Sequence, residues 1–184
     1  MSQQNLPSWH GEDFERDWGF LDVDSKVVLD LGADYGSTAA FFLSKGAAKV
    51  ICVESYAPDY AALAELSLRE PRVTAIEKHL VSAKDFELLI AACQPQVVKV
   101  DVEGAEAYLL FVPTRVLRRV EQFGIELHNL ANAIQCHNPR PPPLEGVNDL
   151  QPDFEKLFER IGFAVEAMHK GNWVLNCTRK AKSA

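Results

Sequence analysis

Val-Leu-Asp-Leu-Gly-Ala-Asp-Tyr-Gly, at residues 28–36, is the segment around which the rest of the chain can be organised. A short apolar run with one acid ends at Gly32, as a buried parallel strand does. Gly32 allows a tight turn, and Gly36 lets the backbone approach a ligand where the next helix begins. Taken alone the pattern is a weak signal, because glycines also end many strands that bind nothing.

Short apolar runs alternate with helical patterns around this segment, from residue 26 to about 127. Strands are expected at 27–31, 49–53, 73–76, 97–100 and 123–127. Helices are expected at 36–45, 58–69, 85–93, 103–111 and 114–120. Repeated strand–helix units of this length predict a parallel sheet with helices on both faces.

The last third of the chain has a different pattern. Residues 130–151 are rich in Asn, Pro and Gly, and we interpret them as a lid beside a site in preference to a polyproline ligand. An amphipathic helix begins at Pro152, and two strands follow at 163–168 and 173–177. We therefore expect an antiparallel hairpin to close a mostly parallel sheet.

Composition restricts the class of protein. With 184 residues, 47% of them hydrophobic and 24% charged, the chain suits a single globular domain. The formal net charge of −7 argues against nucleic acid as a partner. No apolar stretch approaches the ~20 residues of a membrane-spanning helix. The N-terminus lacks a signal pattern and the cysteines form no Cys-x-x-Cys pair, so we expect a cytoplasmic protein.

An acid after the second strand suggests a nucleotide-containing cofactor. Glu54 ends that strand, where a carboxylate can accept both hydroxyls of a ribose. The glycine spacing G-x-x-x-G differs from the dinucleotide pattern G-x-G-x-x-G, and Asp34 would repel a pyrophosphate. With Asp30, these acids instead favour a cofactor that has a cationic end, such as S-adenosylmethionine. The alternative is that all three are solvated acids at strand ends.

Further candidates follow the fourth and fifth strands. Asp101 is expected at the carboxyl end of the fourth strand, facing the same crevice as the first strand. We interpret Glu106 as a favourable acid in the first turn of a helix and leave the role of Glu103 open. Glu126 and His128 alternate along the fifth strand and point to one side, where they could deprotonate a hydroxyl. A purely structural Glu–His contact is an equally good interpretation.

At several places the chain resembles the FkbM-type methyltransferases. The family pattern runs roughly D-x-G-A-N-x-G, an acid ending the second strand, K-x-D-V-E-G-x-E and then an E-h-H run, where h is hydrophobic. The corresponding residues here are 30–36, Glu54, 99–106 and 126–128. Asp34 stands where the family usually has asparagine, and Ser55 where proline is common. The resemblance covers about residues 26–178.

This resemblance implies a single class I methyltransferase domain over residues 1–184, with a cover segment at 1–25. The implied fold is a Rossmann-like three-layer α/β sandwich whose mostly parallel sheet is closed by an antiparallel C-terminal hairpin strand. The implied reaction is methyl transfer from S-adenosylmethionine to a hydroxyl of a small molecule or glycan. His128, held by Glu126, is the candidate base, and Asp101 is the second candidate. The implied cofactor-binding residues are Asp30, Gly32, Ala33, Asp34, Gly36, Glu54, Ser55, Ser82 and Asp101.

Other interpretations stay open. A divalent metal is not predicted, although Asp101, Glu103, Glu126 and His128 could converge on one. An RNA or protein methyltransferase would use a basic cluster such as the arginines within 115–119, which also suits an ordinary solvated face. A regulatory module would bind S-adenosylmethionine without chemistry. The methyl acceptor and the oligomeric state do not follow from the sequence.

Overall fold

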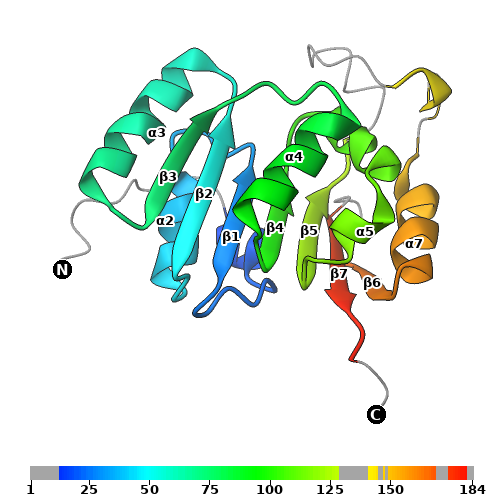
Figure 1. Ribbon diagram of the computed structural model, residues 1–184. Coiled ribbons are helices and arrows are strands. Elements are labelled where there is room, and N and C mark those ends of the chain that lie inside the picture. Colours follow the sequence, from blue (N-terminus) through cyan, green and yellow to red (C-terminus); the bar gives the residue numbers. More distant parts are fainter. Residues whose placement is uncertain (1–12, 129–140, 145–146, 148, 169–173, 182–184) are drawn as a thin grey trace.

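Seven strands form one sheet in the computed structural model, in the order β3-β2-β1-β4-β5-β7-β6 (Figure 1). The structure describes residues 13–128, 141–144, 147, 149–168 and 174–181. The strands are β1 (Val27–Leu31), β2 (Lys49–Glu54), β3 (Val73–Glu77), β4 (Val97–Val100), β5 (Gln122–Glu126), β6 (Phe163–Ala167) and β7 (Val174–Arg179). The helices are α1 (Phe14–Trp18), α2 (Ser37–Ser44), α3 (Ala57–Arg69), α4 (Ala83–Cys93), α5 (Thr114–Leu117) and α7 (Gln151–Arg160), with 3-10 helices η2 (Ala105–Phe111) and η3 (Pro142–Leu144).

The strand directions place the ends of four strands together. Strands β1 to β5 are parallel, and β7 runs antiparallel between β5 and β6. The expected sheet, mostly parallel with an antiparallel C-terminal pair, is therefore confirmed. Because β1 lies between β2 and β4, the chain order reverses beside it, where open α/β sheets bind their ligands. The carboxyl ends of β1, β2, β4 and β5 meet at the upper edge of the sheet in Figure 1.

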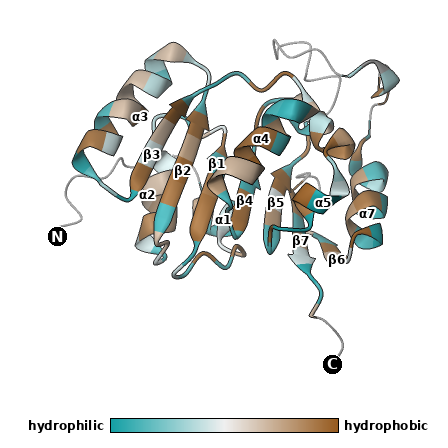
Figure 2. Ribbon diagram, in the orientation of Figure 1, coloured by the Kyte–Doolittle hydropathy of each residue, from teal (hydrophilic) through white to brown (hydrophobic). Residues whose placement is uncertain are grey.

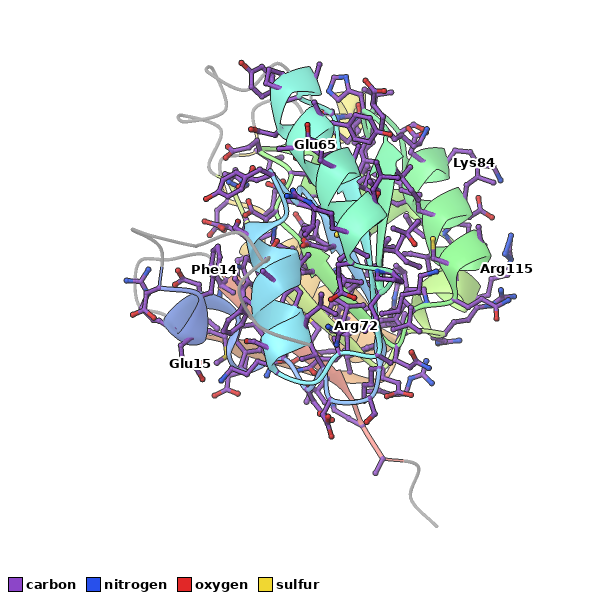
Figure 3. The ribbon with its side chains drawn as sticks, turned by 90° about the vertical axis from the view of Figure 1, so that its left-hand side faces the viewer. Phe14, Glu15, Glu65, Arg72, Lys84 and Arg115 are labelled. Atoms are coloured by element: carbon purple, nitrogen blue, oxygen red, sulfur yellow. The ribbon has the colours of Figure 1, made fainter. Side chains whose placement is uncertain are left out.

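Helices cover both faces of the sheet, because successive side chains of a buried strand point to opposite faces. Val28 packs in a cluster with Phe42 of α2 and Leu63 of α3, whereas its neighbour Leu29 packs in a cluster with Phe86 of α4. In Figure 3, α1 and α2 lie on one side of the sheet and α4 on the other. Figure 2 shows that the strands between these layers are predominantly hydrophobic. The three-layer arrangement is thus confirmed.

The segment after β4 differs from the helix expected at 103–111. It begins later and is a 3-10 helix, η2, at Ala105–Phe111. Gly104 precedes it with a φ of 103°, and Val112 after it has extended backbone, which is the conformation that a residue before proline prefers. Gly104 and the residue before Pro113 therefore set the two limits of η2.

Two expected features fall largely outside the described residues. They are the lid at 130–151, of which only parts are described, and the turn that joins the two C-terminal strands. The described half of the N-terminal segment places α1 against the sheet, with Phe14 and Trp18 buried. Within the described residues, no helix is both long enough and apolar enough to cross a membrane.

Candidate active site

The turn after β1 brings the ends of β1 and β4 into close contact. Gly32 has a φ of 77°, and a Cβ atom there would lie 1.7 Å from the carbonyl oxygen of Asp101. Gly36 has a φ of 93°, and a Cβ atom there would lie 2.6 Å from the side chain of Leu66 in α3. Both glycines are therefore required by backbone conformation and by close packing at the sheet edge.

A buried lysine lies beneath this turn. The Nζ atom of Lys99 in β4 donates to the carbonyl oxygen of Gly32 at 2.5 Å. It also lies 3.3 Å from the carboxylate of Asp30 and 3.4 Å from that of Asp101. Burial acts to lower the pKa of Lys99, but the nearby carboxylates outweigh it and raise the pKa above its ordinary value. Lys99 therefore stays charged and joins the ends of β1 and β4.

The carboxylate of Glu54, at the end of β2, is held by backbone N–H groups. Its Oε1 atom accepts hydrogen bonds from Ser55 and Tyr56, both at 2.6 Å. Its Oε2 atom accepts one from the backbone of Asp34 at 3.1 Å. A carboxylate offers about four acceptor positions, so Glu54 can still accept a hydrogen bond from a ligand.

These side chains line one cavity of about 580 Å³ at the carboxyl edge of the sheet. Its size lies within the usual range for small-molecule sites. Its lining contains seven Asp or Glu side chains and three Lys or Arg side chains, so its charge favours a cationic ligand. The sheet edge contributes Gly32, Asp34, Glu54, Ser55, Lys99, Asp101, Glu126 and His128 to the lining, and α1 contributes Phe14, Arg16, Asp17 and Trp18.

Three predicted catalytic residues lie together at the β4–β5 side of the cavity. Asp101, Glu126 and His128 each offer one ligand atom, and these atoms lie within 4.8 Å of one another. The Nε2 atom of His128 is 3.7 Å from Asp101 and 3.4 Å from Glu103. Burial and the nearby Asp101 raise the pKa of Glu126 to about 7. Burial acts to lower the pKa of His128, but the surrounding carboxylates raise it to about 9.

The structure corrects the interpretation of Glu106. This side chain is fully buried, whereas an acid that only favours a helix N-terminus would be solvated. Its Oε2 atom accepts the N–H of Gly104 at 2.8 Å, and its Oε1 atom accepts the backbone N–H of His128 at 2.8 Å. The Nδ1 atom of His128 is 3.5 Å from the same Oε1 atom. Glu106 thus holds the histidine, a role for which the sequence suggested Glu126.

Other predicted cofactor residues lie behind the cavity or away from it. Asp30 is fully buried and accepts a hydrogen bond from the Thr38 hydroxyl at 2.5 Å, so it supports the site from beneath. Ala33 and Gly36 are also buried, and neither is among the lining residues. Ser82 is not among them either, because its side chain caps the N-terminus of α4.

Sequence reasoning assigned no role to Lys99. A signal was nevertheless present, because Lys99 is the one charged residue in the apolar run Val97–Val100. A lysine inside a buried strand requires carboxylate or carbonyl partners. Those partners, Asp30 and Asp101, were both among the predicted residues.

No family model matches the chain, and no curated protein matches its sequence. A NADB-Rossmann superfamily protein from Streptococcus agalactiae is similar with a TM-score of 0.57 and 14% identity, over 90% of this chain and 67% of that one. A candidate RNA methyltransferase from Pyrococcus horikoshii has a TM-score of 0.54 and 16% identity, over 96% and 93% of the two chains. A ribosomal protein L11 methylase from Lactobacillus delbrueckii subsp. bulgaricus has a TM-score of 0.52 and 17% identity, over 87% and 73%. The chain therefore has the Rossmann-like fold that these proteins share.

Proposed function

We propose that this protein is an S-adenosylmethionine-dependent methyltransferase of the FkbM type that methylates a hydroxyl of a small molecule or glycan. The observation that carries the proposal is the placement of two kinds of group in one cavity. Glu54 lies at the end of β2, and Asp101, Glu126 and His128 lie at the ends of β4 and β5. A ligand that spans this edge would meet both.

The end of the cavity near β2 suits the nucleoside part of the cofactor. Glu54 is held by three backbone N–H groups and retains acceptor capacity for a ribose hydroxyl. Asp34 lies beside it on the lining, and Gly32 allows the ligand to approach the backbone. S-adenosylmethionine carries a sulfonium and an amine, which complement the excess of carboxylates in the lining.

The other end of the cavity suits the chemical step. As the acceptor oxygen forms its bond to the methyl carbon, its O–H bond breaks and the proton passes to a carboxylate of the cluster, Asp101 or Glu126. His128, whose pKa is raised to about 9, already carries a proton at neutral pH, so the structure favours a carboxylate over the candidate base that the sequence suggests. The bond between the methyl carbon and sulfur breaks at the same time, and sulfur keeps the electron pair as a neutral thioether. Because the sulfonium is a good leaving group, the protein has mainly to align the reactants and accept a proton.

The charge of the protein supports a small or uncharged acceptor over RNA. The cavity lining is rich in carboxylates, and the chain has a formal net charge of −7. Both would repel a phosphate backbone. The basic cluster named above includes Arg115 in α5 and Arg118 just after that helix. Neither arginine lines the cavity.

Calorimetric titration with S-adenosylmethionine and S-adenosylhomocysteine tests the proposal. We expect both ligands to bind the unaltered protein. Glu54→Ala should lose about 1–3 kcal/mol of affinity, the usual effect of removing a charged hydrogen-bond partner. Glu54→Gln serves as a second variant, because it retains an acceptor for the backbone N–H groups.

Glu77→Gln is a matched control. Glu77 is aligned with Glu54 in the register of β2 and β3, but it is exposed and does not line the cavity. Its replacement should leave both affinities unchanged. If neither ligand binds folded, unaltered protein, the proposal is wrong.

A further inference from the structure

We infer that Asp101, Glu126 and His128 form a binding site for a divalent cation of the Mg²⁺ or Mn²⁺ type. Their ligand atoms lie within 4.8 Å of one another, so small side-chain movements would place all three around one ion. They extend from the ends of the adjacent strands β4 and β5, which are held in parallel register. Two carboxylates and one imidazole form a donor set that suits such cations.

The surroundings of His128 match those of a metal ligand. A histidine that binds a metal through one ring nitrogen usually has a carboxylate, carbonyl or water at the other. Here Nδ1 lies 3.5 Å from the buried carboxylate of Glu106, which also accepts the backbone N–H of His128 at 2.8 Å. Nε2 is therefore directed toward the opposite side, where the carboxylates of Asp101 and Glu103 lie 3.7 and 3.4 Å away. Glu106 is not one of the three proposed ligands, so it holds the imidazole from outside the site.

The charge around the site also favours a cation. Asp101, Glu103 and Glu126 converge near His128, and all four residues line the cavity. Lys99 is the nearby ammonium, but it also serves Asp30 and the carbonyl oxygen of Gly32. Its single charge is thus shared among several acceptors, so Lys99 alone does not neutralise the three carboxylates.

The role of the cation in catalysis rests on the proposed function, whereas its binding does not. Three protein ligands leave about three positions free on a six-coordinate ion. An acceptor hydroxyl bound at one of them would have a lower pKa, because the ion stabilises the alkoxide. With their ligand atoms on the ion, Asp101, Glu126 and His128 would not take up the proton, which would pass to solvent water instead. The oxygen would be held opposite the sulfonium. A site of this kind would favour acceptors with a hydroxyl that can bind a metal.

Titration of the metal-free protein with Mn²⁺, followed by electron paramagnetic resonance, tests the site without cofactor or acceptor. We expect one equivalent to bind. Asp101→Asn, Glu126→Gln and His128→Asn should each weaken Mn²⁺ binding by more than about 10-fold, since even residues one layer further out have effects of that size. Circular dichroism shows whether each variant is folded. Glu166→Gln, at an exposed acid on β6, is the control and should bind as the unaltered protein does.

The cation site and the proposed function can fail separately. S-adenosylmethionine binding is measured in the presence of a chelator, and Mn²⁺ binding in the absence of the cofactor. No Mn²⁺ binding, or equal binding by the folded variants and the control, would overturn the cation site whatever the cofactor does. Mn²⁺ binding with loss in the three variants supports the site even if S-adenosylmethionine fails to bind.

Discussion

The two ends of the cavity hold their carboxylates in different ways. At the end of β2, Glu54 is surrounded by backbone N–H groups, so its charge is balanced by the fold itself. At the ends of β4 and β5, Asp101, Glu126 and Glu103 lie near one another and near His128. Their charge is balanced only in part, by Lys99 and by protons.

This difference matches the proposed division of the cavity, with cofactor binding at the β2 end and the chemical step at the β4–β5 end. A carboxylate that accepts several backbone hydrogen bonds is held in one orientation. It therefore suits a fixed contact, such as one with a ribose hydroxyl. A cluster of like charges holds protons or a cation that a substrate can displace or use. Four substitutions test the contrast between these two ends, and we consider them from the largest expected effect to the smallest.

Lys99→Met should have the largest effect, because it removes the buried cation that joins the ends of β1 and β4 beneath the cavity. Asp30 would then be a fully buried acid without its ion pair. Breaking a buried pair in this way costs about 3–5 kcal/mol of unfolding free energy, which urea denaturation measures. Lys49→Met, at an exposed position on β2, should change stability by less than about 0.5 kcal/mol. Equal stability of the two variants would show that Lys99 is not a structural link.

Glu106→Ala tests whether the β4–β5 end depends on a buried support. The change leaves the N–H groups of Gly104 and His128 without their carboxylate. We expect a loss of about 2–4 kcal/mol in unfolding free energy, since each unsatisfied buried donor costs about 1–3 kcal/mol. Glu103→Ala is the matched comparison, because that side chain, in the turn just before η2, is 67% exposed and should have little effect. Similar losses in both variants would contradict the assignment.

Ser82→Ala sharpens the boundary of the cofactor end. Because Ser82 caps α4 and is not among the lining residues, its removal should cost about 1 kcal/mol of stability. The affinity for S-adenosylhomocysteine, measured by calorimetry, should not change. A loss of affinity with unchanged stability would instead restore the contact that the family resemblance implies.

Asp34→Asn should have the smallest effect, and it should depend on pH. Partial burial raises the pKa of Asp34 to about 6, Lys99 opposes this, and Asp101 and Glu54 add to it. The folded state therefore binds this proton more tightly than the unfolded state, so its contribution to stability falls as pH rises from about 4 to 6. We expect Asn to stabilise the protein by at most about 1 kcal/mol at pH 8, because solvent screens a side chain that is only partly buried, and by less at pH 5. A gain that is larger at pH 5, measured by urea denaturation, would contradict this sign.

The strands and their common edge could be predicted, because a parallel sheet buried on both faces requires apolar runs. The sequence places Glu54 and Asp101 at one edge of the sheet. The signals are the short apolar run before Gly32 and the acids at the end of β2 and just after β4. The side-chain partners within that edge could not be predicted in the same way. Glu106 has the sequence pattern of an ordinary acid in a first helical turn. Its carboxylate is instead directed inward, to the backbone N–H groups of Gly104, which has a left-handed conformation, and of His128 beyond β5.

Ser82 illustrates a second limit of the sequence. A serine before a helix and a serine in a cofactor pocket have the same local pattern, and only the positions of β3 and α4 distinguish them. Lys99 illustrates the opposite case. Its place within a buried strand was a sufficient signal for a paired ammonium, but its partners come from β1 and from the turn that follows β4.

The most direct test of the central claim is a crystal structure of the protein with S-adenosylhomocysteine. We expect the ribose hydroxyls to lie within hydrogen-bond distance of Glu54. We also expect the thioether sulfur to face Asp101, Glu126 and His128 across the same cavity. A ligand bound with its ribose away from Glu54, or its sulfur away from the β4–β5 cluster, would contradict the account. So would an empty cavity in crystals grown with saturating ligand.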